Sequence, residues 1–236
     1  MPTIDPQRIT HIAFDADDTL WAHENVFVDA KATASKLLAP YLPEEDDLAT
    51  ALYTFERKNL AIFGYGIKGF MLSLIETAIE LSEGKITGNE IQEIITLGKE
   101  MLQHPIELLD GVYEAIDIFE DHYPLLIITK GDLFDQENKI ARSGIGHHFK
   151  IVEIVSEKKP EVYADICQRH NIDPSGLLML GNSLKSDILP VVSIGGQAIH
   201  IPFMYTWLHE RMEEQPIQEG LARAENLHEA IRLVFP

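Results

Sequence analysis

Directly after a short apolar run at residues 9–14, the chain carries three carboxylates in four positions, in the stretch Asp15-Ala16-Asp17-Asp18-Thr19-Leu20-Trp21. The apolar run is partly β-branched, which predicts a buried strand that ends just before the carboxylates. In open α/β sheets, ligands bind beyond the carboxyl ends of the strands. Side chains at positions i and i+2 leave a strand in the same direction, so Asp15 and Asp17 can reach one substrate atom. One of them can attack that atom while the other carries a proton, although an Asp-rich turn also explains this stretch alone.

The composition limits the kinds of partner that the chain can bind. It has 236 residues, 45% of them hydrophobic, and a net charge of −19 from 19 basic and 38 acidic residues. This charge argues against nucleic acid or an anionic membrane as a partner, and an anionic substrate would need a local positive site. Cys167 is the single cysteine, so no internal disulfide can form, and residues 1–8 lack a signal-peptide pattern. No apolar stretch approaches the length of a membrane span, and we expect a cytoplasmic protein.

A long helical segment interrupts the first strand–helix–strand unit. Residues 28–109 show helical periodicity and almost no strand signal, whereas ordinary crossover connections are far shorter. We therefore expect a helical domain at residues 23–107, inserted into a core that residues 1–22 and 108–236 form together. Alternation of strands with helices in the core predicts a parallel sheet with right-handed crossovers. Its further strands are expected at residues 125–128, 151–155, 177–180 and 197–201.

Polar residues follow three of the later strands, at the end where ligands bind. Thr129 and Lys130 come after the second strand, and a hydroxyl, a small residue and a helix amino terminus together suit a phosphate oxygen. Lys159, held by a following proline, can neutralise a phosphate or a carboxylate. Asp187 lies in the loop after the fourth strand and offers a hard oxygen ligand for Mg²⁺. Each feature alone is also explained as a helix cap, a surface turn or a first-turn acid.

These features match, in order, the four motifs of the haloacid dehalogenase superfamily, and the chain resembles its phosphatases with a helical cap inserted after the first motif. The matching positions are Asp15-x-Asp17-x-Thr19, Thr129, Lys159-Pro160 and Gly181-Asn182-Ser183-x-x-x-Asp187. Each motif is weak, but the ordered set on successive strand ends is specific. The resemblance implies an α/β fold, with a Rossmann-like doubly wound parallel sheet as the core and an inserted α-helical cap domain.

The resemblance also implies a role for each matching residue. Asp15 would be the nucleophile that forms an aspartyl-phosphate, and Asp17 would protonate the leaving oxygen and then activate water. Thr129 and Lys159 would bind the transferring phosphoryl group. Mg²⁺ would be held by the carboxylate of Asp15, the backbone carbonyl of Asp17 and the carboxylate of Asp187. The cation and the ammonium group would cancel the repulsion between a phosphate and an anionic nucleophile.

Two positions depart from the pattern of the family, and the cap has its own candidates. Asn182 stands where many relatives have an acid, so we expect Asp187 to be the main carboxylate of the metal site, with Asn182 as a neutral ligand. Lys130 stands where a neutral residue is common, and it either assists phosphate binding or faces solvent. Tyr65 and Lys68 belong to a glycine-rich loop of the cap, which either contributes to substrate binding or is a simple turn.

The predicted function is therefore Mg²⁺-dependent hydrolysis of a small phosphorylated metabolite. Asp17 favours this reaction over that of the 2-haloacid dehalogenases, which lack the acid because a halide leaving group needs no proton. A phosphomutase keeps the acid and stays open as an alternative. A non-catalytic binding protein is disfavoured, because the motif residues are intact, namely Asp15, Asp17, Thr129, Lys159 and Asp187. The sequence identifies neither the substrate nor the oligomeric state, which can be a monomer or a homodimer.

Overall fold

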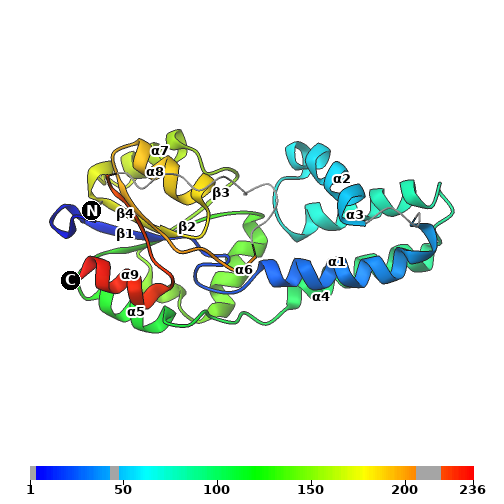
Figure 1. Ribbon diagram of the computed structural model, residues 1–236, viewed down its shortest axis with the longest axis horizontal. Coiled ribbons are helices and arrows are strands. Elements are labelled where there is room, and N and C mark those ends of the chain that lie inside the picture. Colours follow the sequence, from blue (N-terminus) through cyan, green and yellow to red (C-terminus); the bar gives the residue numbers. More distant parts are fainter. Residues whose placement is uncertain (1–3, 43–47, 206–218) are drawn as a thin grey trace. The chain divides into compact units, whose positions relative to one another are not determined.

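The chain divides into two compact units in the computed structural model, which describes residues 4–42, 48–205 and 219–236 (Figure 1). The first unit comprises Met1–Glu24 and Ile106–Pro236, and the second comprises Asn25–Pro105. The insertion expected at residues 23–107 contains the whole of the second unit.

The first unit is built on a parallel sheet of six strands in the order β3-β2-β1-β4-β5-β6. The strands are β1 (His11–Phe14), β2 (Leu125–Lys130), β3 (Ile151–Val155), β4 (Leu177–Gly181), β5 (Gln197–His200) and β6 (Leu221–Arg223). The predicted α/β fold with a doubly wound parallel sheet is confirmed. The sequence analysis missed β6, because a strand of three residues is too short to show a periodicity. The strand order reverses between β1 and β4, and ligands bind at such a reversal.

Helices cover both faces of this sheet (Figure 1). The faces are distinguished by alternate residues of β2, because Leu125 and Ile127 belong to one hydrophobic core and Leu126 and Ile128 to the other. A strand that is buried on both faces is expected to divide its side chains in this way. The first core contains residues of α5 (Val112–Glu120), α6 (Leu133–Ser143) and α9 (Leu227–Val234), and the second those of α7 (Pro160–Arg169) and α8 (Leu189–Ser193). Short helical turns are η1 (Pro6–Arg8), η3 (Gly146–His148), η4 (Pro174–Gly176) and the π-helical η5 (Leu184–Ile188).

Every secondary-structure element in the described part of the second unit is a helix or a helical turn. Its elements are α1 (Glu24–Leu38, starting at the last residue of the first unit's amino-terminal segment), η2 (Ala39–Tyr41), α2 (Leu48–Phe63), α3 (Ile67–Leu81) and α4 (Gly88–Gln103). They enclose a separate hydrophobic core that includes Leu38, Leu52, Leu74 and Ile94. The helical insertion thus has a core of its own, as a small domain requires.

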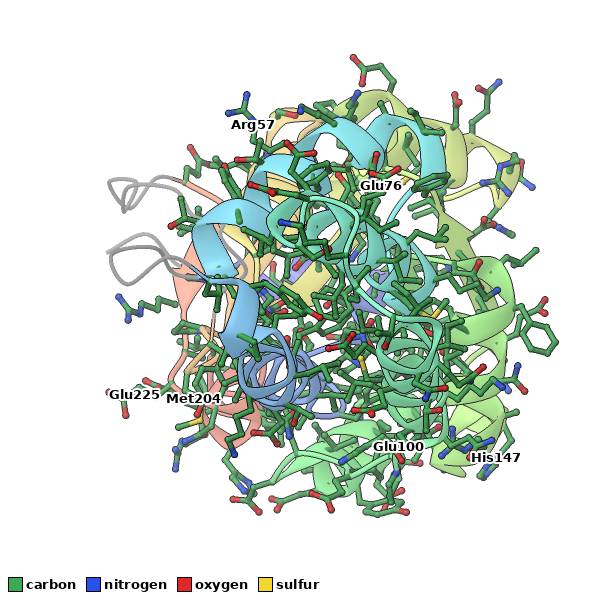
Figure 2. All side chains as sticks on the ribbon, turned by 90° about the vertical axis from the view of Figure 1, so that its right-hand side faces the viewer. Arg57, Glu76, Glu100, His147, Met204 and Glu225 are labelled. Carbon is green, nitrogen blue, oxygen red and sulfur yellow. The ribbon has the colours of Figure 1, made fainter. Side chains whose placement is uncertain are left out.

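Charged side chains of both signs lie at the surface of the described chain. Charged side chains such as Arg57, Glu100 and Glu225 are exposed (Figure 2). Among the described residues, no helix is long and apolar enough to pass through a membrane.

Candidate active site

The register of the central strands brings the predicted motif segments to one edge of the sheet. Phe14 of β1 pairs with Leu180 of β4 and with Ile127 of β2. The amide of Asp15 donates a hydrogen bond to the carbonyl of Leu180 at 2.9 Å, so Asp15 continues the ladder past the end of β1. It therefore lies beside the loop after β4, which carries Asp187.

A buried lysine joins the two carboxylates at this edge. The Nζ atom of Lys158 donates to Oδ1 of Asp15 at 2.5 Å and to Oδ1 of Asp187 at 2.6 Å. All three side chains are buried, with 2% of that of Lys158, 9% of that of Asp15 and 1% of that of Asp187 exposed. Two carboxylates share one ammonium group, and the trio therefore keeps one net negative charge at a site that water hardly reaches.

The backbone of the loop and of the end of β4 closely surrounds the side chain of Asp187. Its Oδ2 atom accepts a hydrogen bond from the amide of Ser183 at 2.9 Å. A Cβ atom at Gly181 would lie 2.5 Å from the carboxylate of Asp187, which is closer than real Cβ atoms approach. The motif therefore needs glycine at the end of β4, so that the carboxylate can fold back onto the strand.

The pKa values follow from burial and from the shared ammonium group. Burial raises the pKa of Asp15 to about 7, although Lys158 opposes this shift and Asp187 adds to it. Burial works against the charge of Lys158, but the carboxylates of Asp15 and Asp187 hold its pKa above the usual value. Lys158 is thus kept as a cation, while Asp15 needs positive charge nearby to act as an anionic nucleophile.

The structure does not bring Lys159, which was the expected phosphate ligand, into this cluster. Lys159 is exposed and forms the N-cap of α7, which Pro160 begins. Its neighbour Lys158 occupies the position that the sequence analysis gave to Lys159. Two consecutive lysines leave the chain on different sides, and the sequence does not reveal which of them faces the core. We therefore replace Lys159 by Lys158 as the candidate.

A second cluster surrounds the carboxylate of Asp17. Its Oδ1 atom accepts from Nε1 of Trp21 at 2.7 Å and from Nζ of Lys139 at 2.8 Å. Its Oδ2 atom accepts from Nε2 of Gln136 at 2.8 Å and from Nζ of Lys139 at 2.7 Å. Burial favours the neutral acid, but His23, Lys139 and Gln136 outweigh it and hold the pKa of Asp17 well below its usual range.

Sequence reasoning missed Gln136 and Lys139, which lie on the first turns of α6. The two are buried, with 2% and 3% of their surface exposed, although long polar residues of a helix usually face solvent. Their spacing of three residues places them on one side of the helix. That spacing is common on any helix, so the pattern alone did not single them out.

Thr129 and Lys130 lie at the end of β2, next to these clusters in the sheet. The Oγ1 atom of Thr129 is buried and has no hydrogen-bond partner among the described residues. A buried hydroxyl without a partner is unfavourable, so it suits a ligand atom that completes its bonding. Lys130 donates to Oγ of Ser186 at 3.1 Å and lies 3.6 Å from the carboxylate of Glu157. With 11% of its side chain exposed, Lys130 does not extend into solvent.

The remaining predicted site residues have less defined surroundings. Asn182 is half-buried, and its backbone carbonyl lies 3.0 Å from Nε2 of His200. Tyr65 is half-buried between α2 and α3, and Lys68 is exposed on the first turn of α3. Tyr65 and Lys68 belong to the second unit, and their part in substrate binding stays a prediction.

The donor set of the site fits a hard divalent cation. Mg²⁺ is usually bound by one or two carboxylates, with water completing its shell. Asp15 and Asp187 supply two buried carboxylates with one uncompensated charge, and the loop of Asp17 supplies backbone carbonyls. No group of three or more His, Cys, Asp or Glu side chains in the described part of the chain is arranged to hold a metal ion. The fit thus depends on the two carboxylates rather than on a closed cage of side chains.

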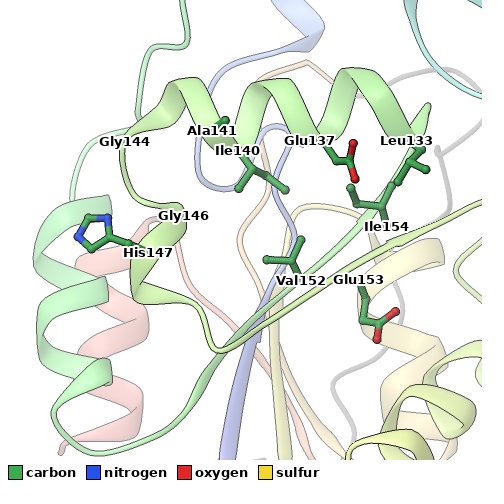
Figure 3. Close-up of a pocket in the computed structure, with 10 residues that line it drawn as sticks. All are labelled: Leu133, Glu137, Ile140, Ala141, Gly144, Gly146, His147, Val152, Glu153 and Ile154. Carbon is green, nitrogen blue, oxygen red and sulfur yellow. The ribbon is translucent and has the colours of Figure 1, made fainter.

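The structure also has an open cavity of about 760 Å³ between α6 and β3 (Figure 3). Its lining includes Leu133, Ile140, Val152 and the exposed His147 (Figure 2), but none of the predicted site residues. We assign the chemistry to the buried carboxylates and not to this cavity, because its polar lining residues, Glu137, His147 and Glu153, form no group that could hold a metal ion.

A parallel α/β sheet with paired aspartates after its first strand and a lysine-linked aspartate after its fourth defines a class of hydrolases. Residues 9–195 match the family model of the haloacid dehalogenase-like hydrolases, and the chain belongs to this family. The family resemblance that the sequence analysis inferred is therefore confirmed.

Two comparisons describe its relatives. The chain is 40% identical to a haloacid dehalogenase-like family hydrolase from Xanthomonas campestris, whose crystal structure matches with a TM-score of 0.85 over 96% of this chain and 92% of that one. It is 28% identical over 130 residues to the N-acylneuraminate-9-phosphatase of Mus musculus. The second match spans about half of each protein, 52% in both cases.

More distant structures share the fold alone. A hydrolase from Bacillus subtilis, YfnB, is 18% identical and matches with a TM-score of 0.64 over 96% of this chain and 99% of that one. A 2-haloacid dehalogenase from Pseudomonas syringae is 19% identical and matches with a TM-score of 0.62 over 96% of this chain and 98% of that one. The fold therefore does not separate phosphatase from dehalogenase chemistry.

Proposed function

We propose that the protein is a Mg²⁺-dependent phosphatase that hydrolyses a small phosphorylated metabolite through an aspartyl-phosphate. The observation that carries this proposal is the buried contact of Lys158 with Asp15 and Asp187, next to the strongly held carboxylate of Asp17. An ammonium group at the nucleophile is the charge that an incoming phosphate requires in a protein of net charge −19.

In the first step, a carboxylate oxygen of Asp15 attacks phosphorus, and the bond from phosphorus to the ester oxygen breaks. The leaving oxygen takes a proton from the carboxyl group of Asp17. Lys158 and the unpaired hydroxyl of Thr129 bind the phosphoryl oxygens. In the ligand-free protein Asp17 is ionised. The negative charge of a bound phosphate ester raises the pKa of Asp17, which takes up a proton from solvent as the ester binds.

In the second step, Asp17 takes a proton from water as the water oxygen attacks phosphorus. The bond between phosphorus and Asp15 breaks, which releases inorganic phosphate and restores both side chains. Asp15, the backbone carbonyl of Asp17 and Asp187, with Asn182 nearby, would hold Mg²⁺. When bound, Mg²⁺ adds positive charge that offsets the repulsion between the phosphate and the nucleophile. Asp17 supports phosphate chemistry over dehalogenation, which needs no proton donor.

The test measures inorganic phosphate released from a panel of phosphate esters in the presence of Mg²⁺. The panel contains p-nitrophenyl phosphate, sugar phosphates, phosphoglycolate, nucleoside monophosphates, flavin mononucleotide and an N-acylneuraminate 9-phosphate. We expect release by the wild-type protein, and none by Asp15→Asn or after chelation with EDTA. Equal background release by the wild type and Asp15→Asn would overturn the proposal. An isomerised sugar phosphate without free phosphate would identify a phosphomutase instead.

A further inference from the structure

Two residues of α6 hold the carboxylate of Asp17, although neither belongs to a motif that the sequence analysis identified. Gln136 donates one hydrogen bond to Oδ2, and the ammonium group of Lys139 lies 2.7 and 2.8 Å from the two oxygens. Both partners are far from Asp17 in the sequence, at separations of 119 and 122 residues. The contact therefore depends on the packing of α6 against the end of β1.

We propose that Gln136 and Lys139 are positioning residues, which hold the carboxylate of Asp17 in the orientation that its proton transfers require. The inference rests on the proposed phosphatase function and adds a requirement to it. A single ion pair fixes only the distance between two groups. Lys139 binds both oxygens of Asp17 and Gln136 binds one of them, so together they also fix the orientation of the carboxylate plane.

A further hydrogen bond and a neighbouring glycine hold the amide of Gln136 next to Asp17. Its Nε2 atom also donates to the carbonyl of Lys130 at 3.2 Å, so the amide group bridges the end of β2 and Asp17. A Cβ atom at Gly131 would lie 2.8 Å from this Nε2 atom. Glycine at this position therefore leaves the space in which the amide of Gln136 reaches Asp17.

The surroundings of Lys139 direct its charge to the same carboxylate. Its side chain is 4% exposed, and its second carboxylate neighbour, Asp135, lies further away at 3.6 Å. The Nε1 atom of Trp21, four residues further along the chain, donates to Oδ1 of Asp17 at 2.7 Å. With these three donors in place, rotation of the carboxylate would break several charge-assisted hydrogen bonds at once.

The chemistry makes this orientation important in two steps that use the same group. Asp17 must lie within about 2.6–3.2 Å of the leaving oxygen in the first step and of water in the second. A misplacement of about 1 Å at a reacting group lowers the rate by roughly a factor of 100. A loose Asp17 should therefore slow protonation of a poor leaving group and slow hydrolysis of the aspartyl-phosphate.

The experiment compares Gln136→Leu, Lys139→Met and Lys139→Arg with the wild type and with Lys150→Met, an exposed lysine of the same unit. Each protein is assayed with p-nitrophenyl phosphate, whose leaving group departs as a stable anion, and with the alkyl phosphate of the panel that turns over fastest. Rapid mixing and acid quenching measure the phosphoenzyme that accumulates. Urea unfolding, followed by circular dichroism, checks that each variant is folded.

For Gln136→Leu and Lys139→Met we expect kcat on the alkyl phosphate to fall about 100-fold, with little change in KM. The rate constant of the first turnover of p-nitrophenyl phosphate should fall much less. Release of p-nitrophenol should show a burst and then a slow phase, in which phosphoenzyme accumulates because its hydrolysis is slow. Lys139→Arg should recover part of the alkyl phosphate activity, and Lys150→Met should resemble the wild type. If Lys139→Met does not fold, Gln136→Leu, which removes no charge, still provides the test.

Equal losses on both substrates without phosphoenzyme accumulation would overturn the inference, because a merely structural role would act in that way. Unchanged kinetics in a folded Gln136→Leu would overturn it as well. Both results leave the proposed function intact, as long as turnover depends on Asp15. Absence of any turnover that depends on Asp15 would overturn the function and the inference together.

Discussion

Replacement of Lys158 by methionine removes the ammonium group that contacts both Asp15 and Asp187. The two contacts, at 2.5 and 2.6 Å, are each worth roughly 6 kcal/mol of Coulomb attraction at an effective dielectric constant of about 20, before the desolvation of the ions is subtracted. Removal of one partner from a buried ion pair typically destabilises a protein by about 3–5 kcal/mol. We expect a loss of this size for Lys158→Met near neutral pH.

The sign of the pH dependence follows from the raised pKa of Asp15. A carboxyl group whose pKa is about 7 in the folded protein, against an ordinary value of 3.8 in the unfolded chain, binds a proton more readily when folded. Stability is therefore lost as the pH rises between these two values. Without Lys158 the pKa of Asp15 rises further, so the loss of stability in Lys158→Met should be greater at pH 8 than at pH 5.

Activity should fall for the same reason. A protonated Asp15 is a poor nucleophile, and the phosphoryl group loses a donor of a kind that contributes about 100–1000-fold to kcat. The assay is kcat/KM for p-nitrophenyl phosphate with saturating Mg²⁺, next to the free energy of unfolding in urea with EDTA at pH 5 and pH 8. The matched control is Lys159→Met, because Lys159 is adjacent in sequence but exposed.

Lys159→Met should change stability by no more than about 0.5 kcal/mol, as surface substitutions usually do, and kcat/KM by less than about twofold. The reasoning would be refuted if Lys159→Met lost as much activity as Lys158→Met. It would also be refuted if Lys158→Met kept the stability of the wild type at both pH values.

Three further predictions concern residues of the same strand ends. Asp18 has a φ of 62°, accepts hydrogen bonds from the amides of His23 and Glu24, and has its pKa raised by burial to about 8. Because this pKa is raised, the carboxyl group of Asp18 makes the folded protein less stable as the pH rises from about 4 to 8. In urea unfolding, Asp18→Asn should therefore leave stability unchanged at pH 4 and increase it by up to about 4 kcal/mol at pH 7. Gly181→Ala should destabilise the protein by about 1–3 kcal/mol, because its Cβ would lie 2.5 Å from the carboxylate of Asp187, and isothermal titration should detect weaker Mg²⁺ binding. Thr129→Val should leave stability within about 1 kcal/mol of the wild type, because the hydroxyl has no partner among the described residues. The same substitution should raise the inhibition constant of inorganic phosphate. An unchanged constant would contradict the assignment of Thr129 as a phosphate ligand.

The sequence predicts the fold and the nucleophile better than it predicts the rest of the site. An apolar run followed by Asp15 defines both a buried strand and the end at which ligands bind, because hydrophobicity and position along a strand are local properties. The choice between Lys158 and Lys159 is not local. It depends on which way the chain turns between β3 and α7, and the two residues are chemically identical.

The partners of Asp17 escaped prediction for a different reason. Gln136 and Lys139 read as polar positions on an amphipathic helix, and their burial results from how α6 packs against the edge of the sheet. Tertiary packing brings together groups whose separation in sequence carries no pattern. The structure shows that glycine at position 131 leaves space for the amide of Gln136, but the sequence alone does not connect these two residues.

The charge balance of the site explains why an acidic protein can attract an anion at this edge. Asp15, Asp17, Asp135 and Asp187 bring four carboxyl groups, and the buried Lys139 and Lys158 bring two ammonium groups, so acidic groups outnumber basic ones in the cluster. A divalent cation would offset this excess of acidic groups and bring positive charge to the nucleophile, which an incoming phosphate ester requires. Phosphate binding should therefore depend on the divalent cation even where no reaction takes place. A folded Asp15→Asn variant should therefore bind inorganic phosphate in Mg²⁺ and lose this binding in EDTA, as measured by isothermal titration; binding of equal strength in both buffers would show that the lysines alone attract the anion.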